Sequence, residues 1–253
     1  MKTRRNDIPT ALVTGAAGGI GKSICEVFFE AGYQVIGVDR RETTDLPYEV
    51  LRFDISHLSR GGATCESFYQ RVEELAEGRL NALVNNAAIQ IVKPIEAITV
   101  SDWAETLDTN LLAPFWLIQH FLPLLRVAKG CVVNIASIHA IVTKSEFTVY
   151  ATSKGALVAL TRTLAIELAP DVRVNAVIPA ATDTPMLRAG FGDNLDGLKR
   201  LGNYHPLGRI AKPEEVAQVT LFLASAQASF VTGSAISVDG GVGACLHDPG
   251  MAR

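Results

Sequence analysis

Short apolar runs that are typical of β-strands alternate along the whole chain with longer segments of helical periodicity. Strands that pair in parallel need a crossover between them, so this alternation predicts a parallel sheet that helices cover on both faces. No proline-rich linker or repeat divides the sequence, so we expect one doubly wound α/β domain over residues 1–253. The predicted strands lie at about residues 10–14, 33–39, 48–53, 80–85, 130–136, 172–178 and 235–238.

Composition narrows the class of protein further. The chain has 253 residues, 48% of them hydrophobic, which is enough for one large core, and its net charge of −3 offers no basic surplus for nucleic acid. Cys25, Cys65, Cys131 and Cys245 form no disulfide or zinc pattern, so we expect no metal and a reducing, cytoplasmic location. The apolar segment 111–125 reads as too short and too interrupted by proline to span a membrane, so we expect a soluble protein.

The first predicted strand runs directly into a glycine-rich turn, TGAAGGIG, and a helical pattern follows. Glycine lets a pyrophosphate approach backbone N–H groups, and the helix presents its positive N-terminal end to that anion. A glycine-rich turn alone is also consistent with a plain tight turn. Its position between a strand and a helix favours a dinucleotide site that includes Gly15, Gly18, Gly19, Ile20 and Gly21.

Three residues in the second half of the chain point to proton transfer. Tyr150 and Lys154 stand four residues apart and would leave the same face of a helix, while Ser137 ends the strand-like run CVVNIAS. A phenol is a poor base at neutral pH, but an adjacent ammonium favours the phenolate and a serine hydroxyl can hold a substrate oxygen. Such pairs also arise by chance in helices, but together with the glycine turn this one indicates proton exchange with an alcohol or a carbonyl.

Ordered motifs over nearly the whole chain resemble those of the short-chain dehydrogenase/reductase family. They are TGAAGGIG (14–21), Asp54 in FDIS, NNAA (85–88), Asn110, Ser137, Tyr150 with Lys154, RVNAVIPAATDT (173–184) and VDGG (238–241). The resemblance implies seven strands, an active site at their carboxyl ends, and a homo-oligomer, either tetramer or dimer. The apolar helix after Asn110 would contribute to that oligomer, although an apolar helix is equally consistent with core packing.

Two positions depart from the family pattern. Ala88 and Ala180 stand where the family usually has glycine, and each adds one methyl group beside the expected nicotinamide site. We expect altered fit of the cofactor rather than lost binding.

Cofactor choice depends on Asp39, which ends the second predicted strand. A carboxylate there can accept hydrogen bonds from the adenosine ribose hydroxyls and repels a 2'-phosphate, so we predict NAD. Arg40 and Arg41 leave NADP open, because a guanidinium can clamp a 2'-phosphate. The resemblance adds further cofactor contacts at Asp54, Ile55, Asn85, Asn86, Ala87, Pro179 and Thr184.

The resemblance also implies a role for each catalytic residue. Ser137 and Tyr150 would hold the substrate oxygen, and Lys154 would bind the nicotinamide ribose and lower the pKa of the tyrosine. Asn110 would hold a water beside the lysine, although an asparagine in a helical segment is also consistent with solvent exposure.

Polar residues beside the expected pocket suggest a small polyol, sugar or hydroxy acid as substrate. Gln90 and His139 would face it, as similar residues do in 3-hydroxybutyrate dehydrogenases and, for the histidine, in some sugar dehydrogenases. A purely structural histidine is an equal alternative, and Phe147 stands where the hydroxybutyrate enzymes carry a lysine that Lys144 would have to replace. Residues 184–207 would form a lid, or else a plain surface loop that is rich in glycine.

Two other functions compete with an NAD-dependent alcohol dehydrogenase. An NADPH-dependent ketoreductase of the 3-oxoacyl carrier-protein type would prefer NADPH, which Asp39 disfavours. It would also need a basic docking patch for an acidic carrier, which the net charge disfavours. A non-catalytic dinucleotide sensor or interaction protein would show a decayed site, whereas Asn110, Ser137, Tyr150 and Lys154 are all present.

Overall fold

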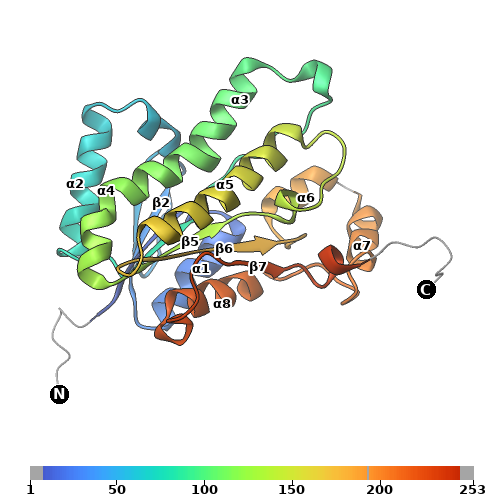
Figure 1. The fold of residues 1–253 in the computed structure, drawn as a ribbon. Coiled ribbons are helices and arrows are strands. Elements are labelled where there is room, and N and C mark those ends of the chain that lie inside the picture. The colour runs from blue at the N-terminus through green and yellow to red at the C-terminus, as the bar shows by residue number, and fades with distance from the viewer. Residues whose placement is uncertain (1–7, 193, 246–253) are drawn as a thin grey trace.

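The computed structural model describes residues 8–192 and 194–245 and contains one sheet of seven parallel strands (Figure 1). The strand order is β3-β2-β1-β4-β5-β6-β7. The predicted doubly wound α/β fold and the seven strands are therefore confirmed. Observed bounds are Thr10–Thr14 (β1), Gln34–Asp39 (β2), Glu49–Arg52 (β3), Ala82–Asn85 (β4), Cys131–Ile135 (β5), Arg173–Pro179 (β6) and Ala235–Val238 (β7).

Helices cover both faces of this sheet because alternate strand residues point to opposite sides and both sides are apolar. Leu12 of β1 packs in one hydrophobic cluster with Phe68, Phe121 and Leu164, whereas its neighbour Val13 belongs to the cluster on the other face. The first cluster lies under α2, α4 and α5, and the second lies under α1 and α8 (Figure 1). The helices are Gly19–Glu30 (α1), Ala63–Ala76 (α2), Val100–Leu107 (α3), Ala113–Ala128 (α4), Thr148–Glu167 (α5), Pro185–Phe191 (α6), Leu195–Asn203 (α7) and Pro213–Ala224 (α8).

Strand β1 marks the point at which the order of the chain through the sheet reverses. It pairs with β2 on one side and with β4 on the other, so the connections that leave β1 and β4 diverge at their carboxyl ends. Ligands of open α/β sheets bind in the crevice that such a divergence creates.

The helix that follows the β4 segment is longer than the sequence suggested. Helix α3, a π-helical turn at Asp108–Leu112 and α4 form one run of 29 residues, Val100–Ala128, with Pro123 inside it. Among the helices of the described residues, only this one is long and apolar enough to cross a membrane. Of an apolar 18-residue stretch within it, 33% is buried inside the structure. The expectation that segment 111–125 is too short and too interrupted by proline was therefore wrong as to length, because the helix continues through Pro123. Leu117 and Phe121 of this helix are buried in the core.

The expected lid, residues 184–207, is more regular than a plain surface loop, because it contains two short helices. Helix α6 is capped by the Thr184 hydroxyl, which accepts a hydrogen bond from the N–H of Leu187 at 3.1 Å. Helix α7 is capped by Asn194, whose Oδ1 accepts from the N–H of Gly197 at 2.8 Å. These caps offset the low helix propensity of the glycines.

Candidate active site

The turn after β1 is shaped so that side chains would not fit in it. Gly15 has a φ of +70°, and a Cβ atom there would lie 2.7 Å from Nδ2 of Asn86. A Cβ on Gly19 would lie 2.8 Å from the Cγ2 atom of Thr184. Asn86 braces the turn, because its Nδ2 donates to the carbonyl oxygens of Thr14 and Gly15 at 2.9 and 3.2 Å. The turn is thus a fixed cradle lined by backbone.

Helix α1 opens onto this cradle without a polar cap. Its N-cap is Gly18, no side chain accepts from its first N–H groups, and its first turn holds no acidic residue. The positive end of the helix is thereby left for an external anion. The cradle and the uncapped helix have room and donors for a dinucleotide pyrophosphate, and contact of this segment with a cofactor stays a prediction.

Asp39 lies at the carboxyl end of β2 and is only 6% exposed. Its Oδ2 accepts from the N–H of Ala17 at 3.0 Å, and its Oδ1 accepts from the N–H and Nε of Arg41 at 2.9 and 3.2 Å. Burial opposes the charge, but the hydrogen bonds from Arg41 and Ala17 outweigh it and hold the pKa of Asp39 below its ordinary value. The carboxylate is therefore ionised and already paired with Arg41.

A basic cavity of ≈ 560 Å³ adjoins Asp39. Its charged and polar lining comes from Arg40, Arg41, Arg52, Asp54, His57 and Thr64. Arg52 belongs to the site because β3 pairs with β2 in a register that sets it beside Asp39. The sequence analysis did not identify Arg52 or His57. The strand pairing that places Arg52 cannot be read from residue spacing, and His57 comes from the short helix after β3. Asp54 caps a short 3-10 helix through a hydrogen bond from the N–H of Ser56 at 3.0 Å, and the adjacent Ile55 is buried.

Hydrogen bonds show which of the two asparagines at the carboxyl end of β4 faces the glycine turn. The Asn85 side chain is buried and donates to Oδ1 of Asn134 at 2.8 Å, so it points into the sheet rather than toward the turn. The N–H groups of Asn86 and Ala87 donate to the hydroxyl of Thr14 at 3.0 and 3.1 Å. Asn86 and Ala87, not the side chain of Asn85, therefore border the cradle.

Ser137, Tyr150 and Lys154 come together at the carboxyl end of β5. Ser137 follows that strand, and Tyr150 and Lys154 lie one turn apart on α5 with exposures of 8% and 2%. The Nζ atom of Lys154 donates to the carbonyl oxygen of Ile135 at 2.8 Å and lies 5.8 Å from the centre of the Tyr150 ring. The three side chains named from the sequence are thus brought into one buried group.

Burial dominates the titration of this group. It raises the pKa of Tyr150, and a hydrogen bond with Ser137 acts in the opposite direction. Burial also lowers the pKa of Lys154 to about 7. The phenol is therefore protonated at neutral pH in this state, and a lowering of its pKa by Lys154 stays a prediction.

Asn110 lies in the π-helical turn between α3 and α4 and is 1% exposed, so the solvent-exposed alternative was wrong. Its Oδ1 accepts from the N–H of Ile89 at 2.9 Å, and its Nδ2 donates to the carbonyl of Ile89 and to Oγ of Ser153, both at 3.0 Å. Ser153 in turn donates to the carbonyl of Tyr150 at 2.7 Å. Asn110 therefore connects the loop after β4 to the helix that carries the tyrosine. Short π-helical turns are frequent at functional sites.

Aromatic rings form one wall next to Tyr150. His139 stacks on Phe147 with ring centres 4.3 Å apart, and both rings meet Tyr150 edge-on at 5.8 and 6.2 Å. The Nζ atom of Lys144 lies 4.8 Å from the centre of the Phe147 ring. Gln90, the other predicted substrate contact, is half-buried in the loop after β4. His139 thus lies beside Tyr150, and its contact with a substrate stays a prediction.

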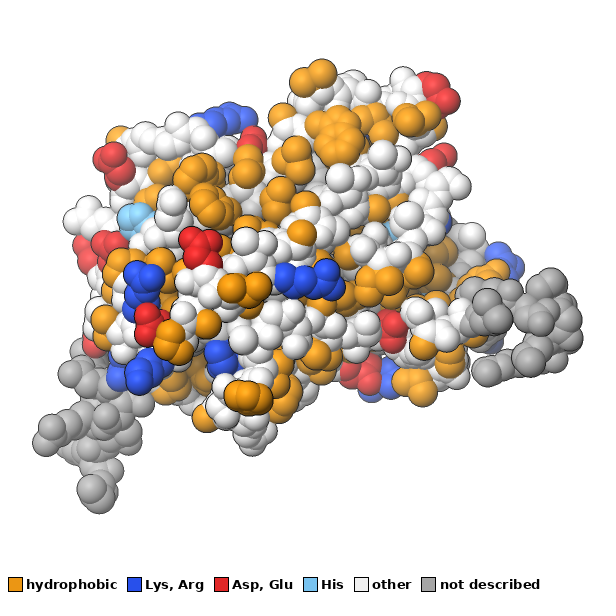
Figure 2. All heavy atoms as spheres, in the orientation of Figure 1, with side chains coloured by type: hydrophobic (Ala, Val, Ile, Leu, Met, Phe, Trp, Pro, Cys, Tyr) orange, Lys and Arg blue, Asp and Glu red, His pale blue; other side chains and the backbone are white. Residues whose placement is uncertain are grey.

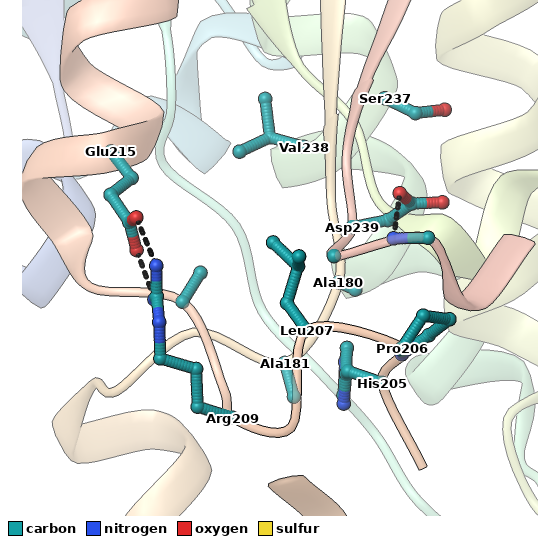
Figure 3. Close-up of a pocket in the computed structure, with 13 residues that line it drawn as sticks. Ala180, Ala181, His205, Pro206, Leu207, Arg209, Glu215, Ser237, Val238 and Asp239 are labelled. Atoms are coloured by element: carbon teal, nitrogen blue, oxygen red, sulfur yellow. Dashed lines mark hydrogen bonds and ion pairs between the residues drawn. The ribbon is translucent and has the colours of Figure 1, made fainter. Parts of the chain in front are cut away.

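The predicted lid, residues 184–207, is fastened where it leaves and rejoins the domain. Thr184 touches the glycine turn, and Arg188 forms a two-pronged ion pair with Asp183 at 2.7 and 2.8 Å. Just beyond the lid, Arg209 pairs with both oxygens of Glu215 at 2.7 Å beside a cavity of ≈ 410 Å³ (Figure 3). Motion of the segment between these two anchors stays a prediction.

The chain is similar over most of its length to known oxidoreductases. A family model described as enoyl-(acyl carrier protein) reductase matches residues 15–243. The chain belongs to the short-chain dehydrogenase/reductase family. It is 36% identical over 245 residues to the 3-oxoacyl-[acyl-carrier-protein] reductase of Thermotoga maritima, and the match covers 91% of this chain and 96% of that protein. The short-chain dehydrogenase/reductases are oxidoreductases, and this chain accordingly is an enzyme that acts on alcohol or keto groups.

Two solved structures extend the comparison. The ligand-free aldohexose dehydrogenase of Thermoplasma acidophilum superposes with a TM-score of 0.89 at 31% identity, with 97% of each chain covered. A 3-ketoacyl-(acyl-carrier-protein) reductase from Brucella melitensis, solved with NADH, gives a TM-score of 0.82 at 28% identity, with 93% of this chain and 98% of that chain covered. This short-chain dehydrogenase/reductase therefore resembles both sugar dehydrogenases and ketoacyl reductases.

Proposed function

We propose that this enzyme oxidises a small, polar secondary alcohol with NAD, or reduces the corresponding ketone. The observation that carries the proposal is the convergence of Ser137, Tyr150 and Lys154 beside a cradle that ends at the ionised Asp39. A polyol or a sugar is the favoured substrate class, in keeping with the likeness to the aldohexose dehydrogenase. A hydroxy acid is the alternative within the same reaction.

Four residues of the chain have separate roles in proton transfer. Ser137 and Tyr150 hold the substrate oxygen, and Tyr150 takes the hydroxyl proton as the alcohol is oxidised. Lys154 favours the phenolate by its charge and holds the cofactor ribose, while Asn110 fixes the helix that carries the tyrosine. When bound, the nicotinamide supplies the hydride acceptor or donor. Proton removal must accompany oxidation, because loss of hydride from a neutral alcohol builds positive charge on carbon.

A single assay tests this proposal. Purified enzyme is offered NAD and NADP in turn, with a panel of polyols, sugars, hydroxy acids and simple secondary alcohols, and reduction of the nicotinamide is followed by absorbance. NAD-linked turnover of a polyol or sugar supports the proposal. A preference for NADP with ketoacyl substrates contradicts it.

The first prediction concerns cofactor choice. Asp39→Asn keeps the shape of the side chain and removes the charge that repels a 2'-phosphate and accepts from the ribose hydroxyls. We expect the ratio of kcat/KM for NAD to that for NADP to fall about tenfold or more, the value of one charged hydrogen bond. Asp45→Asn is the matched control, since Asp45 is exposed in the loop after β2. An unchanged ratio in Asp39→Asn assigns cofactor selectivity to other residues.

One observation favours a second candidate function, an NADPH-dependent ketoreductase. The cavity beside Asp39 holds Arg40, Arg41 and Arg52, and guanidinium groups suit a 2'-phosphate. The similarity to the Thermotoga maritima reductase agrees with this alternative. Reduction of acetoacetyl-CoA with NADPH, faster than any NAD-linked oxidation, would establish it in place of the dehydrogenase.

The second prediction concerns assembly, for which we propose a dimer or a tetramer. Hydrophobic side chains gather on the face over α3, α4 and α5 (Figure 2), where Val127 and Ile166 are 71% and 81% exposed. An apolar surface of this kind is typical of a contact between subunits. Sedimentation velocity should give at least twice the mass of one chain, and Ile166→Asp should lower it. Ile95→Asp, at another exposed isoleucine that lies outside α3, α4 and α5, is the control, and a wild-type monomer would contradict the proposal.

A further inference from the structure

The ring of His139 is held on three sides. Phe147 stacks on one face at an angle of 4°, the edge of the imidazole meets Tyr150 at an angle of 75°, and Nδ1 lies 2.8 Å from the hydroxyl of Thr143. Each contact limits a different motion of the ring. A group whose rotamer is locked in this way can be used to orient a ligand.

The other ring nitrogen is unused. Within residues 8–192 and 194–245, no hydrogen-bond partner is found for the Nε2 atom of His139, although the ring is half-buried and adjoins the catalytic tyrosine. Buried polar atoms usually have a partner within the protein, whereas a half-buried one is open to a partner from a ligand. Because the ring is beside Tyr150, a second polar group of the substrate is the natural partner for Nε2.

The imidazole is uncharged at neutral pH. Burial and then the positive charge of Lys144 lower the pKa of His139 to about 4. A neutral imidazole offers one donor and one acceptor but no charge, so it suits a hydroxyl and attracts a carboxylate little. The ammonium group of the neighbouring Lys144 lies over the face of the Phe147 ring.

The contacts of the Thr143 hydroxyl favour one tautomer of His139. It lies 3.5 Å from the carbonyl oxygen of Lys144, a long contact, in which it is the donor. A hydroxyl that donates there can accept from Nδ1–H of His139, which leaves Nε2 as an acceptor. Thr143 would then act on the substrate through His139.

We infer that Thr143 positions His139 so that Nε2 accepts a hydrogen bond from a second hydroxyl of the substrate, next to the carbinol that reacts. The enzyme therefore prefers neutral diols, polyols or sugars to hydroxy acids of the same length. This inference rests on the proposed dehydrogenase function and narrows its substrate class. It makes Thr143 a positioning residue and His139 a specificity residue.

Matched substrates and variants test the inference. Butane-2,3-diol, butan-2-ol and 3-hydroxybutyrate are compared in Thr143→Val, which removes only the hydroxyl, and in His139→Phe, which keeps a stacking ring. We expect both variants to lower kcat/KM for the diol about fivefold to tenfold, as loss of one hydrogen bond does, and to leave butan-2-ol within about twofold. Wild-type enzyme should favour the diol over 3-hydroxybutyrate.

Three controls separate positioning from folding. Thr143→Ser should restore the diol activity, the dissociation constant of NADH should stay constant, and Thr163→Val, which alters an exposed hydroxyl on α5, should change nothing. Equal losses for the diol and butan-2-ol, or a wild-type preference for 3-hydroxybutyrate, would overturn the inference and leave the dehydrogenase standing. No turnover of any alcohol by wild-type enzyme with either cofactor would instead refute the proposed function, and the inference with it.

Discussion

Replacing Tyr150 with phenylalanine is expected to lower kcat by about 10²–10⁴-fold, the usual contribution of a positioned acid or base. The substitution removes one oxygen from a ring that is 8% exposed and packed edge-on against His139 and Phe147, so the fold should be kept. Neither Ser137 nor Lys154 can replace it, because a serine hydroxyl is a far weaker acid and Lys154 already donates to Ile135. Steady-state kinetics in both directions measure the loss.

Two controls show whether the loss is chemical. The dissociation constant of NADH, measured by fluorescence, should change less than about threefold in Tyr150→Phe, since only the proton-transfer group is removed. Tyr33→Phe removes a phenol oxygen from a half-buried ring that packs on Phe28, far along the chain from the site, and should retain full activity. Residual turnover of Tyr150→Phe within tenfold of wild type would refute the role of this tyrosine as the base.

The pH dependence of wild-type turnover follows from the same group. Burial raises the pKa of Tyr150 and lowers that of Lys154 to about 7, so the phenol is protonated at neutral pH. Oxidation needs the deprotonated phenol, so its rate should rise with pH, whereas reduction needs the phenol proton and should slow. In Tyr150→Phe this opposition between the two directions should vanish.

Much of the fold could be predicted because its strands are continuous apolar runs. A strand that is buried on both faces needs such a run, so all seven predicted segments match observed strands to within about two residues at each end. Asp39 could be assigned to the carboxyl end of β2 for the same reason. Ser137, Tyr150 and Lys154 could be grouped because a strand end and one turn of helix fix their directions.

Other parts of the site depend on contacts that sequence spacing does not reveal. Arg52 reaches the basic cavity only through the pairing of β3 with β2, and His139 meets Phe147 only because the loop between them folds back. Helical spacing leaves Asn110 open to solvent, but it is buried in a π-helical turn that the spacing does not reveal. Nothing in the sequence indicates that the Thr14 hydroxyl accepts hydrogen bonds from the N–H groups of Asn86 and Ala87, because those partners are far away along the chain.

A Gly21→Ala substitution is expected to have the largest effect on stability and cofactor binding together. Gly21 is buried in the first turn of α1, and a Cβ atom there would overlap the carbonyl oxygen of Gly15 and approach Nδ2 of Asn86 to 2.6 Å. Alanine raises helix propensity by about 1 kcal/mol, but neither the backbone of the cradle nor its asparagine brace can retreat freely. We expect the free energy of unfolding to fall by about 3 kcal/mol and Tm by about 6–12 °C.

Gly155→Ala is the matched control, because Gly155 lies within α5 and a Cβ there would meet nothing closer than the carbonyl oxygen of Ala140 at 4.0 Å. With no collision to oppose the gain in helix propensity, its Tm should stay equal to that of wild type or rise by a few degrees, about 2–4 °C per kcal/mol.

The dissociation constant of NADH should rise at least about tenfold in Gly21→Ala, because helix and turn must separate where the pyrophosphate would contact backbone N–H groups. A Gly21→Ala protein with wild-type Tm and wild-type NADH affinity would show that the contact between α1 and the turn does not form the cradle. Loss of stability with unchanged affinity would separate packing from binding and move the pyrophosphate contact away from Gly21.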